Sequence, residues 1–179
     1  QDIGLFFAWG DTEGHELEDG YLFSWENYKW GAVTGYDTYF TKYCSDSSRG
    51  KDGFTDGKAE LDLEDDAAFV NWGSDWRMPS KQQLDELQNE CTWTLTTLGD
   101  VQGYNVDVPN GNSIFLPATG FRIDGELIGP GLGFYWSSSL HTDFNVRGWS
   151  FHFEGENCHV CGTYERSRGQ VIRAVRVSK

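Results

Sequence analysis

The chain has 179 residues, a net charge of −14, and aromatic residues at 16% of its positions. This length fits one domain with its own core, and so many rings mean that aromatic side chains fill much of it. The acidity excludes nucleic acid as a ligand, because phosphate binding needs a clustered basic face. No apolar run is long enough to cross a membrane.

The first sixty residues contain little regular structure. Residues 4–9 are nearly all apolar and predict a buried strand. Residues 10–60 predict a long irregular segment rich in Gly, Asp, Ser and Tyr. Such a segment inside a domain is normally pinned by its own side chains or functional, and here we expect pinning. The expected anchors are Tyr21, Phe23, Trp25, Tyr28 and Trp30.

Two short helices follow. Residues 63–72 predict a helix that ends near Gly73. A second helix over about 80–90 begins at Ser80, which forms a capping-box pattern with Gln83 three residues later. Its apolar positions recur at helical spacing and define one buried stripe: Leu84, Leu87 and Cys91.

The remainder of the chain is typical of β-structure. Asn110-Gly111 is a hairpin turn signal between two alternating stretches. One strand, then helices, then many strands without βαβ alternation predict a single α+β domain with an antiparallel sheet. The expected strands beyond the second helix cover 92–98, 104–108, 113–116, 134–139, 149–153 and 170–177.

Four cysteines are too few for a disulfide framework in a chain of this length. Cys44 and Cys91 could pair or remain free thiols. Cys158 and Cys161 have the spacing of a zinc knuckle or a redox pair. A structural zinc site needs four ligands, and no second pair exists. A redox pair begins a helix, whereas this one lies in β-like sequence. We therefore expect no metal and no cofactor.

Other residue types with chemical potential also lack a catalytic pattern. The histidines at 141, 152 and 159 have no carboxylate or nucleophile at a recognisable spacing. The serines at 137–139 lack the flanking glycines of a nucleophile elbow. An acidic cluster lacks the glycine-centred loop of an EF-hand, so we interpret it as helix N-terminal charge and solvated surface. Its members are Glu60, Asp62, Glu64, Asp65 and Asp66.

Several motifs occur in a characteristic order. Gly-Leu-Phe-Phe-Ala-Trp-Gly-Asp opens the chain at residues 4–11, and Trp-Arg-Met-Pro-Ser stands at 76–80 after Asn-Trp-Gly at 71–73. Asn-Gly-Asn-Ser-Ile-Phe-Leu-Pro-Ala-Thr-Gly-Phe-Arg precedes Tyr-Trp-Ser-Ser-Ser, and Arg-Ala-Val-Arg closes the series. This series resembles the C-type-lectin-fold domains related to formylglycine-generating enzymes and the Fibrobacter major paralogous domain. More narrowly, it resembles variable proteins of diversity-generating retroelements in bacteria and phages.

The resemblance implies one C-type lectin-like domain over residues 1–179, with short helices, a twisted antiparallel sheet and long irregular loops. It also implies that part of the family domain precedes Gly4, and that residues 141–168 form a ligand-binding segment diversified by adenine-directed mutagenesis. Alignment to the family assigns the variable positions to His141, Asp143, Phe144, Asn145, Val146, Arg147, Ser150, His152, His159, Cys161, Gly162, Thr163, Tyr164, Ser167 and Arg168.

The genetic code allows a check on this resemblance. Mutation of the two adenines in an Asn codon yields residues such as Phe, Ser, Tyr, Cys, His, Arg, Asp, Gly, Thr and Val. It never yields Lys, Gln, Glu, Met or Trp. Residues 134–169 contain no Lys, Gln or Met, although Gln170 follows directly. We therefore expect the Trp and Glu residues of this segment to be fixed: Trp136, Trp149, Glu154, Glu156 and Glu165.

Alternation near residue 150 predicts how one strand would serve both roles. Ser150 and His152 share one strand face and are expected at the surface, whereas the other face packs the core. Because aromatic and arginine side chains dominate binding hot spots, the main affinity carriers are expected to be Phe144, Arg147, Tyr164 and Arg168.

The resemblance implies a binding protein without enzymatic activity, on a bacterial surface or a phage tail. Its expected ligand is a protein or glycan of a host or neighbouring cell, and the sequence leaves the oligomeric state open. One alternative is a surface adhesion module of the same fold that does not diversify. Another is an oxidase of the formylglycine-generating type, which would require Cys158 and Cys161. Calcium-dependent sugar binding is not expected, because the Glu-Pro-Asn, Gln-Pro-Asp and Trp-Asn-Asp motifs are missing.

Overall fold

The computed structural model describes residues 4–155 and 157–177, without the side chains of 157–161. Within this part of the chain, twelve short strands form five small sheets, accompanied by two α-helices and two 3-10 helices. All strand pairs between named strands are antiparallel. The expected α+β mixture with antiparallel sheets is therefore confirmed, with strands the larger part.

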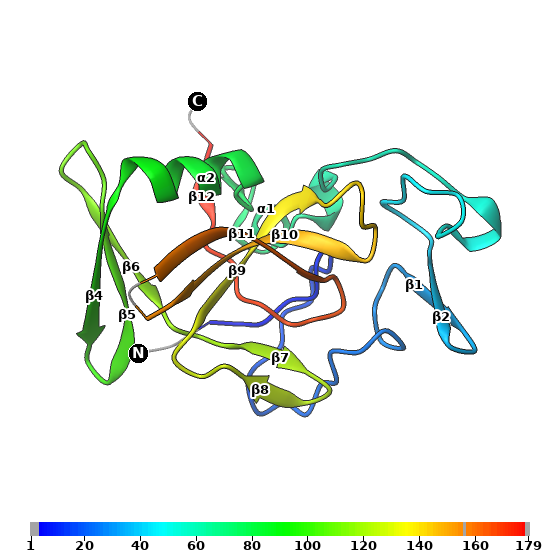
Figure 1. Ribbon diagram of the computed structural model, residues 1–179, viewed down its shortest axis with the longest axis horizontal. Helices are drawn as coiled ribbons and strands as arrows, with labels where there is room; N and C mark the ends of the chain where they lie inside the picture. The colour runs from blue at the N-terminus through cyan, green and yellow to red at the C-terminus, as the bar shows by residue number, and fades with distance from the viewer. Residues whose placement is uncertain (1–3, 156, 178–179) are drawn as a thin grey trace.

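The sheet that carries most of the candidate binding segment has the order β11-β10-β9. It consists of β9 (Gly133–Leu140), β10 (Arg147–Glu154) and β11 (Asn157–Glu165). Figure 1 shows it in the middle of the molecule, between the β4–β6 sheet and the β1–β2 hairpin. The sequence predicted β9 and β10. It did not predict β11, because the residues of this strand do not alternate between polar and apolar.

A second sheet packs against β10. It contains β4 (Thr92–Leu98), β5 (Val101–Asp107) and β6 (Ser113–Pro117), as predicted. Rings join the two sheets: Trp93 stacks on Phe151 at 5.0 Å between centroids, and Tyr104 meets Phe153 edge-on at 4.9 Å. The alternation at 149–153 therefore places these phenylalanines in the core, as expected.

The two predicted helices are present. The first region contains η2 (Leu63–Asp65) and α1 (Ala67–Trp72), and the side chain of Asp66 caps α1 by accepting from two backbone amides. The second is α2 (Lys81–Glu90), which Ser80 and Gln83 cap reciprocally. These ends follow the sequence signals because capping depends on neighbouring residues alone.

Smaller elements complete the molecule. They are β1 (Gly31–Thr34) with β2 (Asp37–Phe40), η1 (Lys51–Gly53), β7 (Phe121–Ile123) with β8 (Glu126–Ile128), and β3 (Trp76–Arg77) with β12 (Val175–Arg176). The strand expected over 170–177 is thus reduced to two residues, preceded by isolated bridges at Gln170 and Val171.

The expected strand at residues 4–9 is wrong, although its burial is right. Phe6 and Phe7 make only isolated bridges, yet the stretch from Phe6 to Trp9 is buried. Two indoles hold it in place, since Trp9 Nε1 donates to the carbonyl of Ser137 at 2.9 Å and Trp136 Nε1 donates to that of Phe7 at 2.8 Å. Side-chain hydrogen bonds therefore take the place of most of the backbone hydrogen bonds that would hold a strand.

Aromatic anchors fix the long irregular segment, as expected. Tyr28 is buried and donates from its hydroxyl to the carbonyl of Trp9 at 2.8 Å. The guanidinium of Arg166, fully buried, lies over the ring of Phe40 at 4.0 Å and beside Tyr28 at 5.3 Å. Arg166 directly follows β11. The irregular segment at residues 10–60 therefore shares one core with the C-terminal part of the chain.

Cys44 and Cys91 are both free thiols, which settles the alternative left open by the sequence. Cys44 is buried, and burial raises the pKa of its thiol. Among the described residues, no helix is both long and apolar enough to cross a membrane.

Candidate ligand-binding surface

The turn between β9 and β10, residues 141–147, is the most exposed part of the candidate segment. Its backbone is closed by three hydrogen bonds: the amide of His141 donates to Arg147, that of Phe144 to His141, and that of Arg147 to Phe144, at 2.8–3.1 Å. Phe144 is 61% exposed, while Asp143 and Arg147 are exposed beside it. A closed turn therefore presents an apolar ring, an anion and a cation to solvent.

One residue of this turn points inward. Asn145 is buried; its Oδ1 accepts from the backbone amide of Ser45 at 2.7 Å, and its Nδ2 donates to the carbonyl of Thr142 at 3.2 Å. The expectation that Asn145 lies at the surface is therefore wrong. The sequence held no signal for this contact, because Ser45 is 100 residues away.

A ring stack supports the base of the turn. His141 lies on Trp149 with 4.8 Å between centroids and 20° between planes, and Phe144 contacts the same imidazole at 5.0 Å. Lys81, the first residue of α2, places its ammonium 5.1 Å from the Trp149 ring. The stack on Trp149 thus holds the His141 ring in place, and this limits how freely the turn can move.

The exposed arginine of the turn reaches across to the next strand. Arg147 donates from one guanidinium nitrogen to both the carbonyl and the hydroxyl of Thr163, each at 3.3 Å. These bonds are long and exposed, so they orient Arg147 weakly and leave most of its donors free for a ligand.

A second part of the segment is half-buried against aromatic residues. His152 stacks on Phe134 at 6.0 Å, and Tyr164 meets both rings edge-on at 5.1–5.9 Å. Burial raises the pKa of the Tyr164 hydroxyl. A side-chain carbon added to Gly162 would lie 2.3 Å from His152 Nδ1, so these two positions constrain each other.

Arg168 borders the same group. Its guanidinium lies 5.2 Å from the ring of Phe121 and pairs with the carboxylate of Glu165 at 3.0 Å. The pair is only partly buried, so it positions Arg168 more than it stabilises the fold.

Two further members of the segment are buried. Ser150 is 1% exposed and donates from its hydroxyl to Gln170 Oε1 at 2.5 Å. Ser167 is buried beside Arg166. The expectation that the Ser150–His152 face lies at the surface is wrong for Ser150, because the N-terminal segment and residues 166–171 cover that side of β10.

The fifteen predicted positions therefore divide by exposure. Asp143, Phe144 and Arg147 are exposed; His141, Val146, His152, Gly162, Thr163, Tyr164 and Arg168 are half-buried; and Asn145, Ser150 and Ser167 are buried. The backbone of β11 pairs His159 with His152, but the side chains of His159, Cys161 and Cys158 lie outside the described residues.

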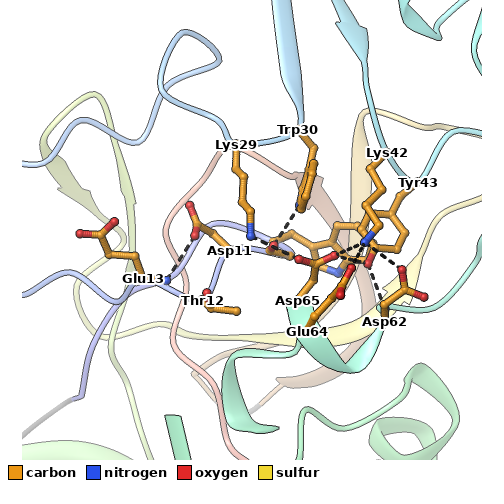
Figure 2. Close-up of polar contacts among 12 residues, drawn as sticks. Asp11, Thr12, Glu13, Lys29, Trp30, Lys42, Tyr43, Asp62, Glu64 and Asp65 are labelled. Atoms are coloured by element: carbon orange, nitrogen blue, oxygen red, sulfur yellow. Dashed lines mark hydrogen bonds and ion pairs between the residues drawn. The ribbon is translucent and has the colours of Figure 1, made fainter. Parts of the chain in front are cut away.

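The acidic cluster is a separate site, shown in Figure 2. Carboxylate oxygens of Asp62, Glu64 and Asp65 lie within 4.8 Å of one another. The ammonium of Lys42 sits among them, at 2.8, 3.0 and 2.6 Å from the three carboxylates. The negative charge is thus balanced by a lysine of the fold itself.

The interpretation of this cluster as helix N-terminal charge is confirmed for Asp66, which caps α1, but the interpretation as solvated surface is wrong for Asp65 and Asp66, which are both buried. Asp66 accepts backbone amides at the start of α1 and also that of Met78. Burial alone would raise the pKa of Asp65, but hydrogen bonds from Lys42, Tyr43 and Lys29 outweigh it and hold the pKa below its ordinary value. No local pattern could have pointed to Lys42, because its partners Asp62, Glu64 and Asp65 follow at least twenty residues later.

No family model, curated protein or solved structure matches this chain. The geometry of the molecule itself therefore carries the assignment of the site.

Proposed function

We propose that this protein is a non-enzymatic ligand-binding protein with a C-type lectin-like fold, diversified by a retroelement. In this proposal the turn at residues 141–147 and the adjoining ends of β10 and β11 form its binding surface. The observation that carries the proposal is Phe144, which is 61% exposed on a turn anchored by Asn145. Large apolar side chains held outward on a fixed backbone are typical of binding anchors.

The chemistry around Phe144 supports recognition. Arg147 offers donors for carboxylates and carbonyls, Asp143 offers acceptors, and His141 contributes a ring beside Phe144. The three exposed side chains of the turn, Asp143, Phe144 and Arg147, include no hydroxyl or thiol nucleophile. A mixed surface of this kind fits binding better than catalysis.

The composition of the segment supports diversification. Residues 134–169 lack Lys, Gln and Met, which adenine mutagenesis of Asn codons cannot produce. One tryptophan that such mutagenesis could not create, Trp136, is fully buried and ties β9 to the N-terminal segment. This is the role expected for a fixed scaffold residue.

The buried positions narrow the set that diversification could rewrite. Large residues at Asn145, Ser150 or Ser167 would overpack the core, so we assign these three to the scaffold. The proposed variable surface keeps seven positions, here called the outward positions, whose side chains are exposed or half-buried: His141, Asp143, Phe144, Arg147, Thr163, Tyr164 and Arg168. A protein or glycan of another cell is the proposed ligand, reached from a bacterial surface or a phage tail.

The test of diversification is genomic. We expect a reverse transcriptase gene near this one, and a near-copy of the segment encoding 134–169 whose adenines coincide with the outward codons. A neighbourhood without that copy would contradict diversification and favour a fixed adhesion module.

The test of the surface is a display library. Adenine-type codons at the seven outward positions should yield variants that mostly fold, and selection against a model protein such as lysozyme should yield binders. A matched library at exposed positions of β4 and β5 should fold equally well but yield few binders, because it lacks the anchored turn. Equal yields from both libraries would contradict the assignment of the surface.

A further inference from the structure

A groove lies apart from the residues of the turn. Two adjoining hollows, with volumes of about 530 and about 330 Å³, share Trp72, Ile172 and Arg173 in their walls. The larger is completed by Trp76 and Ala174. The smaller continues past Leu5 and Phe115. Because Trp72 is 47% exposed and Trp76 37%, the groove displays two indoles that the core does not use.

No described residue pairs with the backbone of residues 172–174 along this groove. Residues 172–174 connect the bridge at Val171 to strand β12, and the chain is not helical there. Among the described residues, none forms a hydrogen bond with the backbone of Ile172, Arg173 or Ala174. Three successive residues thus have amide donors and carbonyl acceptors that no described residue occupies, beside an apolar surface, as at the edge of a sheet.

The charge of the groove is opposite to that of the molecule. The chain carries a net charge of −14, yet Arg173 is exposed and makes no ion pair with the described residues. Arg176, three residues beyond Arg173, is exposed and reaches Asp75 only at 3.8 Å. A cation in the wall of a hollow that two tryptophans also line would favour a ligand that combines a carboxylate with apolar side chains.

We propose that this groove binds an extended peptide segment of a partner protein, which adds as a strand along residues 172–174. Its backbone would pair with the free groups of those residues, and its alternate side chains would enter the two hollows. A carboxylate of the peptide would pair with Arg173. Backbone pairing with pockets for alternate side chains is the general mode of strand addition.

The unpaired backbone is what favours a peptide over a compact small ligand. A sugar or a small aromatic acid would use the indoles and Arg173, but would leave most amides and carbonyls of 172–174 bound to water. The proposal does not depend on the turn at 141–147, because none of the turn residues lines either hollow.

The test uses a random heptapeptide library displayed on phage and selected against the whole protein. We expect enriched peptides to alternate apolar residues with at least one Asp or Glu. Synthetic copies should bind ~10-fold more weakly to Trp72→Ala and to Arg173→Gln, as loss of one anchor implies. Tyr36→Ala and Arg49→Gln remove a ring and a cation elsewhere and should change binding less than about twofold.

A second measurement needs no variant. Hydrogen exchange of the amides at 172–174 should slow when the selected peptide is bound to the wild-type protein, whereas a ligand that uses side chains alone would leave it unchanged.

The proposal is overturned if no peptide is enriched, if selected peptides bind both groove variants normally, or if exchange at 172–174 is unaffected. A dimer that dissociates on Trp72→Ala would also overturn it, by showing that a second copy fills the groove. Phe144→Ala should leave peptide binding intact, so this test can fail or succeed independently of the proposed function.

Discussion

The cluster around Lys42 and the turn at 141–147 are both polar, and the loop from Lys42 to Ser45 contacts both. They use polarity in opposite ways. In the cluster, one ammonium contacts three carboxylates, so the charges are satisfied within the fold. In the turn, Asn145 is buried, whereas Asp143, Phe144 and Arg147 face solvent. The number of internal partners, not residue type, therefore distinguishes a structural polar site from one available to a ligand.

The largest expected effect comes from Lys42→Met. It would leave the buried Asp65 without its shortest ion pair, so the free energy of unfolding should fall by about 3 kcal/mol. Urea unfolding measures this loss. Lys58→Met is the matched control, because Lys58 is largely exposed and its pair with Asp62 should contribute less than about 0.5 kcal/mol. Equal losses in the two variants would show that the cluster is no tighter than ordinary surface pairs.

Ser150→Tyr should cause the next largest loss in the free energy of unfolding. The site is 1% exposed, so a larger side chain must displace packed neighbours, and we expect a loss of about 2 kcal/mol. Asp143→Tyr adds the same ring at an exposed position of the turn and should cost less than about 0.5 kcal/mol. Chemical unfolding of both proteins gives the comparison. If Ser150→Tyr costs no more stability than Asp143→Tyr, Ser150 belongs to the proposed variable positions and not to the scaffold.

Asn145→Ala should lower stability by about 1–2 kcal/mol, because the amide of Ser45 would lose its acceptor in a buried place. Asn145→Asp keeps an acceptor oxygen and should lose less. Hydrogen exchange provides the local readout: the amide of Ser45 should exchange faster in the alanine variant. Unchanged exchange would mean that the turn is held by its own backbone alone.

Acid should weaken the cluster around Lys42. The pKa of Asp65 is held below its ordinary value in the folded protein, so the unfolded chain takes up a proton first as pH falls. The stability contributed by Asp65 is present above the ordinary carboxyl pKa and is lost as pH falls through the lower folded value. Asp62, whose pKa is lowered by Lys42 and Lys58, acts in the same direction. Unfolding between pH 6 and pH 3 should depend less on pH in Asp65→Asn; an identical dependence would contradict this account.

The smallest expected effect on stability is that of Phe144→Ala. The ring is mostly exposed, so the free energy of unfolding should change by less than about 0.5 kcal/mol. Binding to any ligand found for the turn should nevertheless weaken ~10-fold or more, as for an interface anchor. Thermal unfolding and titration calorimetry separate the two. A large loss of stability would place Phe144 in the fold.

The sequence predicted those elements whose signals are local. The capping box at Ser80 and Gln83 and the hairpin at Asn110-Gly111 involve neighbouring residues, and the structure has them where expected. The predictions for residues 4–9 and β11 failed for the converse reason. Indole hydrogen bonds between residues more than a hundred positions apart hold the former, and the latter pairs without alternating.

For the candidate surface, the sequence located the segment but not the direction of each side chain. Alternation along β10 correctly placed Phe151 and Phe153 in the core, yet it implied an exposed Ser150. The rule failed because both faces of β10 are covered, one by the β4–β6 sheet and the other by the N-terminal segment. The burial of Asn145 was not predicted because its partner, Ser45, lies in a loop that no sequence pattern connects to the turn.

The two indole hydrogen bonds between the start of the chain and β9 constrain how the molecule is made. Trp9 must wait for Ser137, and Phe7 for Trp136, so a growing chain emerging from the ribosome lacks these partners for its apolar residues 6–9 until β9 has been synthesised. Contacts so distant in sequence also slow folding, since long loops must close before they are formed. We expect the nascent protein to depend on chaperones that shield the aromatic rings of Phe6, Phe7 and Trp9 until β9 emerges.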